Sequence, residues 1–433
     1  MCYLLNLIYL FVFLLLSPWL IYKALRAGKY RRGMWSKITG NAFLRQGADR
    51  CVWFHGVSVG EIHLLGPVVK RFRERHPDWE CVVSSSTETG LAEAGKRFPD
   101  LAVFVWPLDF SWAVRRALRH VKPELVVLAE GEIWPNFVLA AKSLGVTVGI
   151  INGRMSPRSY RRYRRVGRPV AKLMHQLDFV VVQTEEFARY FRALGAPEQR
   201  VHVTGSVKYD GVVTDRRNVR TENLRRLFGI GLADPVWVAG STQAPEEQLA
   251  IDIFRRVQDQ IPQLRFILVP RQKDRFEEVT SLLKKNHVPF VRRSELHEPP
   301  ETVAPVILVD TIGELEAIWG LADVAFVGGS LDGRRGGQNM IEPAAYGAAV
   351  LFGPDVWNFR DTAQRLERAR AAIQVADARE LERRVFELFQ DPIARGELGA
   401  RAQQLVKEQQ GATGRTLAAL EHLSIFERVG KAT

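Results

Sequence analysis

Three acidic residues and one lysine stand in short motifs whose neighbours suit the transfer of a chemical group. Glu61 closes the segment His55-Gly-Val-Ser-Val-Gly-Glu61, where an apolar run meets a glycine turn and the expected start of a helix. A carboxylate at this position can serve as a general base. It can equally complement the positive end of the helix dipole, and the residues alone leave both roles open.

A second acidic motif follows another apolar run. Ala129-Glu-Gly-Glu-Ile-Trp-Pro-Asn136 places Glu130 and Glu132 at alternate positions. Carboxylates of this kind carry out acid–base work, and the neighbouring Trp134 offers a surface on which a sugar ring can stack. Further along the chain, Gly205-Ser-Val-Lys-Tyr-Asp210 supplies Lys208.

Other motifs of the first half suit anionic groups. The segment Arg154 to Arg168 holds seven arginines and no acidic residue. Such a run either forms a solvated helix face or binds phosphates, in a lipid surface or in a phosphorylated acceptor. The segment Ser84-Ser-Ser-Thr-Glu-Thr-Gly90 suits a sugar or an anion, and equally well a helix cap.

The net charge of +13 is confined to two zones of the chain. The first 50 residues hold eight Lys or Arg and one acid, and the arginine run described above is the second zone. The rest of the chain holds 46 basic and 47 acidic residues, which is close to neutral. A surface built for nucleic acid is therefore not expected, and no nucleic-acid motif accompanies either zone.

The first basic zone follows an apolar segment, Tyr3–Tyr22, whose strongly polar residues are Asn6 and Ser17. At ~1.5 Å per residue, a helix of this length spans the hydrocarbon core of a bilayer. Six Lys or Arg follow between Lys23 and Lys37 and none precedes, which predicts that the following domains stay in the cytoplasm. Pro18 leaves open a helix that dips into one leaflet.

Two series of short apolar runs alternate with segments of helical periodicity, which predicts buried parallel strands. The polar stretch Tyr209–Asp234 separates the series and marks the expected domain boundary. Ligands of doubly wound sheets bind at the carboxyl ends of the strands, where the motifs lie. The expected strands are Cys51–His55, Cys81–Ser85, Leu101–Val105, Leu125–Ala129, Val146–Ile151 and Phe179–Val182, then Val236–Ala239, Phe266–Val269, Pro289–Val291, Val306–Val309, Val324–Val327 and Val350–Phe352.

Glycine pairs and polar loops follow the expected strands of the second half, as the phosphate and ribose of a nucleotide require. The sequence holds neither a P-loop nor a dinucleotide fingerprint, so ATPase and NAD functions lose their main support. It also holds no His-Glu-x-x-His and no Cys-x-x-Cys pair, and no metal site is expected. The loops are Gly240–Glu247, Pro270–Arg275, Asp310–Glu314, Gly328–Ser330 and Gly336–Pro343.

Taken together and in this order, the motifs resemble those of the 3-deoxy-D-manno-octulosonic acid (Kdo) transferases of lipopolysaccharide assembly, glycosyltransferase family 30. That family is recognised by H-x-V-S-V-G-E, E-x-E-[LI]-W-P-N, N-x-R-x-S-x-R-S and G-S-x-K-[FY]-D. The pattern continues with G-S-T, P-R, D-T-x-G-E-L, F-V-G-G-S and G-G-x-N-x-x-E. All of them occur between His55 and Glu342, so the resemblance covers nearly the whole chain.

The resemblance implies an α/β protein of the GT-B type, with two Rossmann-like doubly wound domains facing a central cleft. The implied bounds are 1–28 for an N-terminal membrane helix, 29–212 for the acceptor domain and 213–433 for the CMP-sugar domain. The implied reaction is an inverting transfer of Kdo from CMP-Kdo to the tetraacyl disaccharide bisphosphate precursor of lipid A, called lipid IVA. It would take place at the cytoplasmic face of the inner membrane, beside anionic lipid, with no cofactor and no metal.

Carried over by position, Glu61 is the implied general base, and Glu130 and Lys208 would support the charge changes of the transition state. The matches to the CMP-binding segments are Pro270, Arg271, Ile312, Gly313, Glu314, Asn339, Met340, Ile341 and Glu342. Gln338 and Gln272 stand where the family usually has histidine, and glutamine cannot titrate. Two alternatives stay open: a membrane-surface GT-B transferase that uses another activated sugar, and a non-catalytic scaffold that binds anionic lipid.

Overall fold

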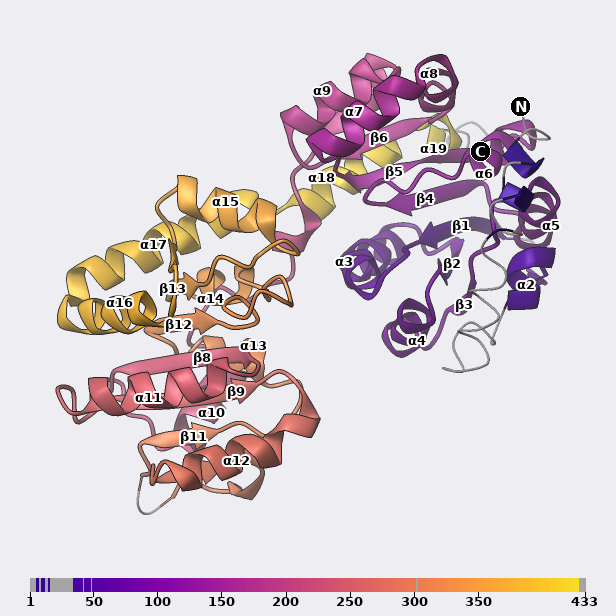
Figure 1. Cartoon of the computed structure of the whole chain (residues 1–433). Helices are drawn as coiled ribbons and strands as arrows, with labels where there is room; N and C mark the ends of the chain where they lie inside the picture. Colours follow the sequence, from indigo (N-terminus) through magenta and orange to yellow (C-terminus); the bar gives the residue numbers. More distant parts are fainter. Residues whose placement is uncertain are drawn as a thin grey trace. The chain divides into compact units, whose positions relative to one another are not determined.

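A computed structural model describes residues 5–7, 9–11, 15, 34–41, 43–47, 49–300 and 303–427 of the chain. The chain divides into two compact units, residues 1–210 with 410–433 and residues 211–409. Each unit contains a seven-stranded sheet in which neighbouring strands pair in parallel (Figure 1). The doubly wound α/β class predicted from the sequence is confirmed for both units.

The first sheet is a Rossmann sheet with one additional edge strand. Its strands are β1 (Arg50–His55), β2 (Trp79–Ser85), β3 (Ala102–Val105), β4 (Leu125–Ala129), β5 (Thr147–Gly153), β6 (Phe179–Val182) and β7 (Val201–Val203). They are arranged as β3-β2-β1-β4-β5-β6-β7. The order reverses between β1 and β4, and the loops that follow these two strands diverge there and leave room for a ligand.

Helices cover both faces of this sheet. They are α2 (Met34–Thr39), α3 (Val59–Arg75), α4 (Glu88–Arg97), α5 (Ser111–Val121), α6 (Pro135–Ser143), α7 (Pro157–Val166), α8 (Arg168–Met174), α9 (Glu185–Ala193), α18 (Ala412–Glu421) and α19 (Ser424–Glu427). Side chains alternate along each strand: Trp53 packs in a core with α5, α6, α8 and α9, whereas Phe54 packs in a core with α3, α4 and α18. Burial on both faces explains why the strands read as continuous apolar runs.

The second sheet repeats this plan. Its strands are β8 (Val236–Thr242), β9 (Arg265–Pro270), β10 (Phe290–Arg292), β11 (Val306–Leu308), β12 (Val324–Val327), β13 (Ala349–Phe352) and β14 (Ile373–Gln374). The order is β10-β11-β9-β8-β12-β13-β14, so the reversal lies between β8 and β12. The helices are α10 (Val219–Leu227), α11 (Glu246–Gln258), α12 (Phe276–Lys285), α13 (Leu315–Trp319), α14 (Ile341–Ala345), α15 (Arg360–Arg368), α16 (Ala378–Gln390) and α17 (Pro392–Gln409).

The twelve strands expected from apolar runs all form, and two short edge strands were missed. β7 has two exposed residues of three, and β14 has only two residues, so neither produces an apolar run. Each is held by pairing with a neighbouring strand rather than by its own composition.

The C-terminus corrects one expectation. The first unit ends at Asp210, close to the expected boundary at 212, but residues 410–433 return to it and do not belong with the CMP-sugar domain of 213–433. Ala412, Leu417 and Leu420 of α18 are buried in the core that contains α3. The Asp210 carboxylate accepts hydrogen bonds from the backbone N–H groups of Gly411 and Thr413. This contact holds the returning chain at the start of α18.

Most of the apolar segment Tyr3–Tyr22 and of the anchor expected over 1–28 lies outside the described residues. Within the described ranges, no helix is both long and apolar enough to cross a membrane. The residues of this segment that the structure does describe include Asn6 and Tyr9, whose side chains contact the first sheet unit.

Candidate functional site

The first unit brings the predicted acid–base residues together at the reversal of its sheet. Glu61 lies in the first turn of α3, directly after β1, and Glu130 follows β4. Because β1 and β4 are parallel neighbours, both loops emerge at the same edge of the sheet. The negative charges of Glu130 and Glu132 act on Glu61, which places all three carboxylates in one electrostatic environment.

A variant of the capping box, in which Glu61 accepts from the residue before the N-cap, fixes the side chain of Glu61. Ser58 is the N-cap of α3, and its hydroxyl accepts a hydrogen bond from the Glu61 backbone N–H at 3.4 Å. In return, one carboxylate oxygen of Glu61 accepts from the Val57 N–H at 2.7 Å and the other from the Ser58 hydroxyl at 3.2 Å. The helix-end role considered from the sequence is therefore real. It holds the carboxylate in one place without removing it from solvent.

The Glu61 carboxyl has the proton affinity of a base that works near neutral pH. Burial raises its pKa from 4.5 to about 7, and the charges of Glu130 and Glu132 add to this shift. The hydrogen bonds from Val57 and Ser58 oppose the shift without cancelling it. A general base is most effective when its pKa lies close to the working pH, so the helix cap and a catalytic role are compatible.

Glu130 is held between two cations. Lys208 Nζ lies 2.7 Å from one carboxylate oxygen, and Arg154 Nε lies 2.6 Å from the other. The Glu130 backbone has a φ of +60°, a conformation that costs energy in a residue with a Cβ and that is concentrated at functional sites. The turn is closed by the Arg154 N–H, which donates to the Glu130 carbonyl at 2.8 Å.

Asn152 positions Lys208 through the backbone of the turn that carries it. The Asn152 side chain is fully buried, and its oxygen accepts from the Val207 N–H at 3.1 Å. This bond fixes the 3-10 turn η2 (Val207–Tyr209) that carries Lys208. The structure thus brings Glu130 and Lys208 into direct contact, a pairing that was not predicted from the sequence.

Arg154 belongs to this site and was not among the site residues predicted from the sequence. It was grouped with the arginine run, whereas the structure places it in the loop before α7 and in contact with Glu130. One local signal in the sequence could have distinguished Arg154 from the rest of the run. Arg154 precedes Ser156, the N-cap of α7, whereas the other arginines follow Ser156.

The remaining arginines of the run are exposed on and just after α7. Among the described residues, none of them forms an ion pair. Tyr160 stacks on Tyr190 of α9 with ring centroids 4.5 Å apart, and this contact holds α7 against the unit through its apolar side. The exposed arginines are Arg158, Arg161, Arg162, Arg164, Arg165 and Arg168.

The Ser84–Gly90 segment supports the Glu61 turn. Thr87 is the N-cap of α4, as one of the two interpretations from the sequence proposed, and its hydroxyl also donates to the Val57 carbonyl at 2.7 Å. His55 is buried beside Ser84 and stacks on Trp106, with centroids 3.7 Å apart. Burial lowers the pKa of His55 to about 3, so this histidine stays neutral and belongs to the frame of the site.

In the second unit, the segments expected to bind CMP follow β9, β11 and β12. These strands end at one edge of the sheet, and the Arg271 N–H donates to the Thr242 carbonyl at the end of β8, at 3.0 Å. Burial raises the pKa of Glu342, and the hydrogen bond from Asn339 and the positive charge of Arg271 partly offset this shift. Asn339 Nδ2 donates to Glu342 Oε1 at 2.9 Å.

The other predicted donor residues divide into exposed and buried positions. Ile312 and Gly313 are exposed, and Glu314 pairs with Arg293 at 2.8 Å. The side chains of Pro270, Met340 and Ile341 are buried, so these three residues can present only backbone atoms to a ligand.

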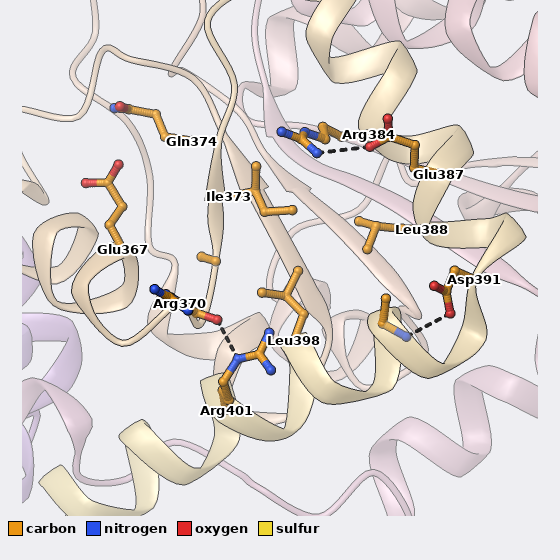
Figure 2. A pocket seen from close by; sticks show the side chains of 12 residues that line it. Glu367, Arg370, Ile373, Gln374, Arg384, Glu387, Leu388, Asp391, Leu398 and Arg401 are labelled. Atoms are coloured by element: carbon orange, nitrogen blue, oxygen red, sulfur yellow. Dashed lines mark hydrogen bonds and ion pairs between the residues drawn. The ribbon is translucent and has the colours of Figure 1, made fainter.

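A cavity of about 630 Å³ lies elsewhere in the second unit and is not the expected donor site (Figure 2). It opens beside the amino end of β14, between α15, α16 and α17, whereas the CMP segments follow the carboxyl ends of the strands. Two of its arginines have partners within the cavity wall: Arg384 contacts Glu387 at 3.0 Å, and Arg401 donates to the Arg370 carbonyl at 2.7 Å (Figure 2).

The sequence matches known proteins over most of its length. A family model described as 3-deoxy-D-manno-octulosonic-acid transferase (kdotransferase) matches residues 28–211. The 3-deoxy-D-manno-octulosonic acid transferase of Chlamydophila psittaci is 33% identical over 359 residues, which are 82% of each chain. The enzyme of the same name from Bordetella pertussis is 33% identical over 93% of this chain and 95% of its own.

The chain belongs to the Kdo transferase family. It is therefore a glycosyltransferase, and the resemblance read from the motifs is confirmed. A solved glycosyltransferase from Rickettsia africae has a TM-score of 0.54, with 12% identity over 89% of this Kdo transferase and all of that chain. At this identity the likeness shows the fold alone, which is that of GT-B glycosyltransferases.

Proposed function

We propose that this Kdo transferase moves Kdo from CMP-Kdo to the tetraacyl disaccharide bisphosphate precursor of lipid A, with inversion and with Glu61 as the general base. The observation that carries the proposal is the Glu61 carboxyl, held by its capping box with a pKa of about 7 beside the Glu130 cluster. Family membership supports Kdo as the transferred sugar. The loops of the second unit that match the CMP-binding segments support a nucleotide site there.

The reaction is a single displacement at the anomeric carbon of Kdo. A hydroxyl of the acceptor attacks this carbon, its proton passes to Glu61, and the bond to the CMP phosphate breaks with its electron pair leaving on CMP. CMP departs as a phosphate monoester, which needs charge stabilisation more than a proton. In the second unit, Arg271 is an exposed cation at the predicted donor loops that can supply it.

Glu130 and its two cations keep the charge around the base balanced. As Glu61 takes up a proton, the acceptor oxygen loses one, and fixed neighbouring charges stabilise this redistribution without reorganising. Lys208 and Arg154 each contact a different oxygen of the Glu130 carboxylate, so both are already in place before the reaction. The free side of the Arg154 guanidinium remains open to an anionic group of the acceptor.

The acceptor carries phosphates, and the exposed arginines of α7 offer them unpaired guanidinium groups. Arginine binds phosphate oxygens through two parallel N–H groups, and binding is strongest where no carboxylate competes. The next arginine after Arg154 is Arg158, in the first turn of α7, so the same segment continues from the base cluster to the exposed arginines.

The N-terminal segment supports placement at a membrane. Asn6 Nδ2 donates to the Ser111 hydroxyl at 2.7 Å, and Tyr9 donates to Asp109 at 3.1 Å. Large apolar side chains around these contacts are exposed, a pattern that fits burial in lipid. They include Leu7, Phe11, Leu15, Trp35 and Trp112. We propose that this surface holds the first unit on the cytoplasmic face of the inner membrane, next to its acylated acceptor.

A transfer assay in detergent tests the proposal. Purified protein would be supplied with CMP-Kdo generated in situ and with the tetraacyl disaccharide bisphosphate, and products would be read by mass spectrometry. The proposal predicts a mass gain of one or more Kdo units that is absent with Glu61→Gln. Folded protein that binds CMP but forms no product would point to another acceptor. Folded protein that does not bind CMP would point to another donor, with Gln338 and Gln272 as the first positions to examine.

A further inference from the structure

Two consecutive buried carboxylates stand at the reversal of the second sheet and have no part in the proposed chemistry. Glu246 and Glu247 begin α11, directly after the loop that follows β8. Both are completely buried, which is rare for glutamate unless every oxygen has a partner. In the sheet, β8 lies between β9 and β12, so the start of α11 sits between the loops that leave those two strands.

Glu246 binds the loop that follows β12. Its Oε2 accepts from the Gly329 N–H at 2.6 Å, and its Oε1 accepts from the Ser330 and Leu331 N–H groups at 2.9 and 3.0 Å. A fourth bond, from the Gln243 N–H at 3.1 Å, closes the turn that precedes α11. One carboxylate thus fixes three successive amides of a neighbouring loop.

The first glycine of this loop is required by the close approach of the end of β8 and of the Glu246 carboxylate. A Cβ on Gly328 would lie 2.8 Å from Glu246 Oε2 and 2.7 Å from the Thr242 Cα, closer than real Cβ contacts come. Gly329 has a φ of +67°, which favours glycine. Close packing therefore accounts for Gly328, and backbone conformation accounts for Gly329.

Glu247 binds the loop on the other side. Its two oxygens lie 2.9 and 3.2 Å from Nε and Nη2 of Arg275, a paired contact that fixes the guanidinium plane. Arg275 ends the 3-10 turn η3 (Lys273–Arg275), which closes the loop that begins with Pro270 and Arg271. The carboxylate thereby holds the far end of a segment that is expected to contact CMP.

We infer that Glu246 and Glu247 are positioning residues, which set the loops after β12 and β9 relative to each other so that both can grip the nucleotide. This inference rests on the proposed function, because it takes those loops to be the donor site. Neither glutamate contacts the nucleotide, since all of their oxygens are occupied by protein donors. Their effect passes through the backbone of Gly329–Leu331 and through Arg275.

The test is CMP binding by the full-length protein in detergent, measured by calorimetry well below the unfolding temperature. In Glu246→Gln, a single side-chain oxygen remains to accept from the four amides that the two carboxylate oxygens bind in the unmodified protein. In Glu247→Gln, a single bond replaces the paired contact with Arg275. We expect the dissociation constant for CMP to rise 10- to 100-fold in each. In the transfer assay, KM for the donor should rise while KM for the acceptor stays the same.

A matched control is a second paired contact to α11, away from the donor loops. Glu382 of α16 makes a paired contact with Arg256 of α11, at 2.6 and 2.8 Å, on the exposed surface. Glu382→Gln should leave CMP binding unchanged. Arg275→Lys keeps the charge and loses the paired geometry, so it should weaken CMP binding as Glu247→Gln does.

The outcomes separate this inference from the proposed function. If the unmodified protein does not bind CMP, the donor assignment fails. If it binds CMP and the folded Glu246 and Glu247 variants bind equally well, with only their melting temperatures lowered, the two residues are purely structural and the inference is overturned.

Discussion

The two sheets place glutamates at equivalent positions and use them in opposite ways. In the first unit, Glu61 follows β1 at the sheet reversal and keeps contact with solvent, with a pKa raised to about 7. In the second unit, Glu246 follows β8 at the corresponding reversal and is fully buried under four backbone N–H groups. The difference lies in how completely the oxygens are satisfied. Burial raises the pKa of both carboxyls, but the Glu61 carboxyl keeps contact with solvent and can exchange a proton with an acceptor, whereas the Glu246 carboxyl is enclosed by the amides that it binds.

The largest expected effect is that of Glu61→Gln. The substitution keeps the size of the side chain and removes its basicity, so kcat should fall by roughly 10²–10⁴-fold, the usual contribution of a general base. CMP binding by the second unit should not change. Retention of more than about a tenth of the activity would contradict the assignment of the base and would remove the contrast with Glu246.

The next effect concerns the cations on Glu130. Lys208→Ala and Arg154→Ala should each lower kcat by roughly 10- to 100-fold, since each leaves a charge of the cluster without its partner. The double variant should lose less than the product of the two single effects, because both cations act on one carboxylate. Fully multiplicative losses in a double-mutant cycle would show that the two residues act independently.

The pH dependence of the rate and of the stability should have opposite signs at Glu61. The rate should rise as pH passes upward through about 7, where the base loses its proton. The folded protein binds that proton more tightly than the unfolded chain, so this contribution to stability is present below about pH 4.5 and is lost as pH rises through 7. At pH 8, Glu61→Gln should therefore be as stable as the unmodified protein or up to roughly 2 kcal/mol more stable.

Denaturant unfolding of the unmodified protein and of Glu61→Gln at pH 5 and pH 8 measures the predicted pH dependence of stability. A stability gain that is equal at the two pH values would point to packing instead of titration. Glu246→Gln should behave in the opposite way to Glu61→Gln. The loss of acceptors for buried amides should lower its free energy of unfolding by roughly 1–3 kcal/mol.

The smallest effect is expected on the exposed surface of α7. Replacing Arg158, Arg162 and Arg165 together by Ser should raise the KM for a bisphosphorylated acceptor by roughly 10-fold, an effect that shrinks in high salt. The KM for the donor should stay the same. Equal salt dependence in the variant and the unmodified protein would argue that this helix face is merely solvated.

Much of the fold could be predicted from the sequence because buried parallel strands are locally conspicuous. Runs such as Leu125–Ala129 and Val324–Val327 form strands with the expected ends. The edge strands β7 and β14 escaped notice because they are short or exposed. The return of α18 to the first unit was not predicted, because the sequence of an amphipathic helix does not indicate which core the helix packs against.

The sequence by itself determined the two series of strands, the position of each motif at a strand end and the membership of the family. Those features depend on the order of neighbouring residues along the chain. The tertiary structure alone decided that Arg154 and Lys208 both pair with Glu130 and that Glu61 has a pKa near 7. It also decided that Glu246 binds the backbone amides of the loop after β12. Burial and pairing arise between segments far apart in sequence, and the behaviour of a carboxylate follows from which donors surround it.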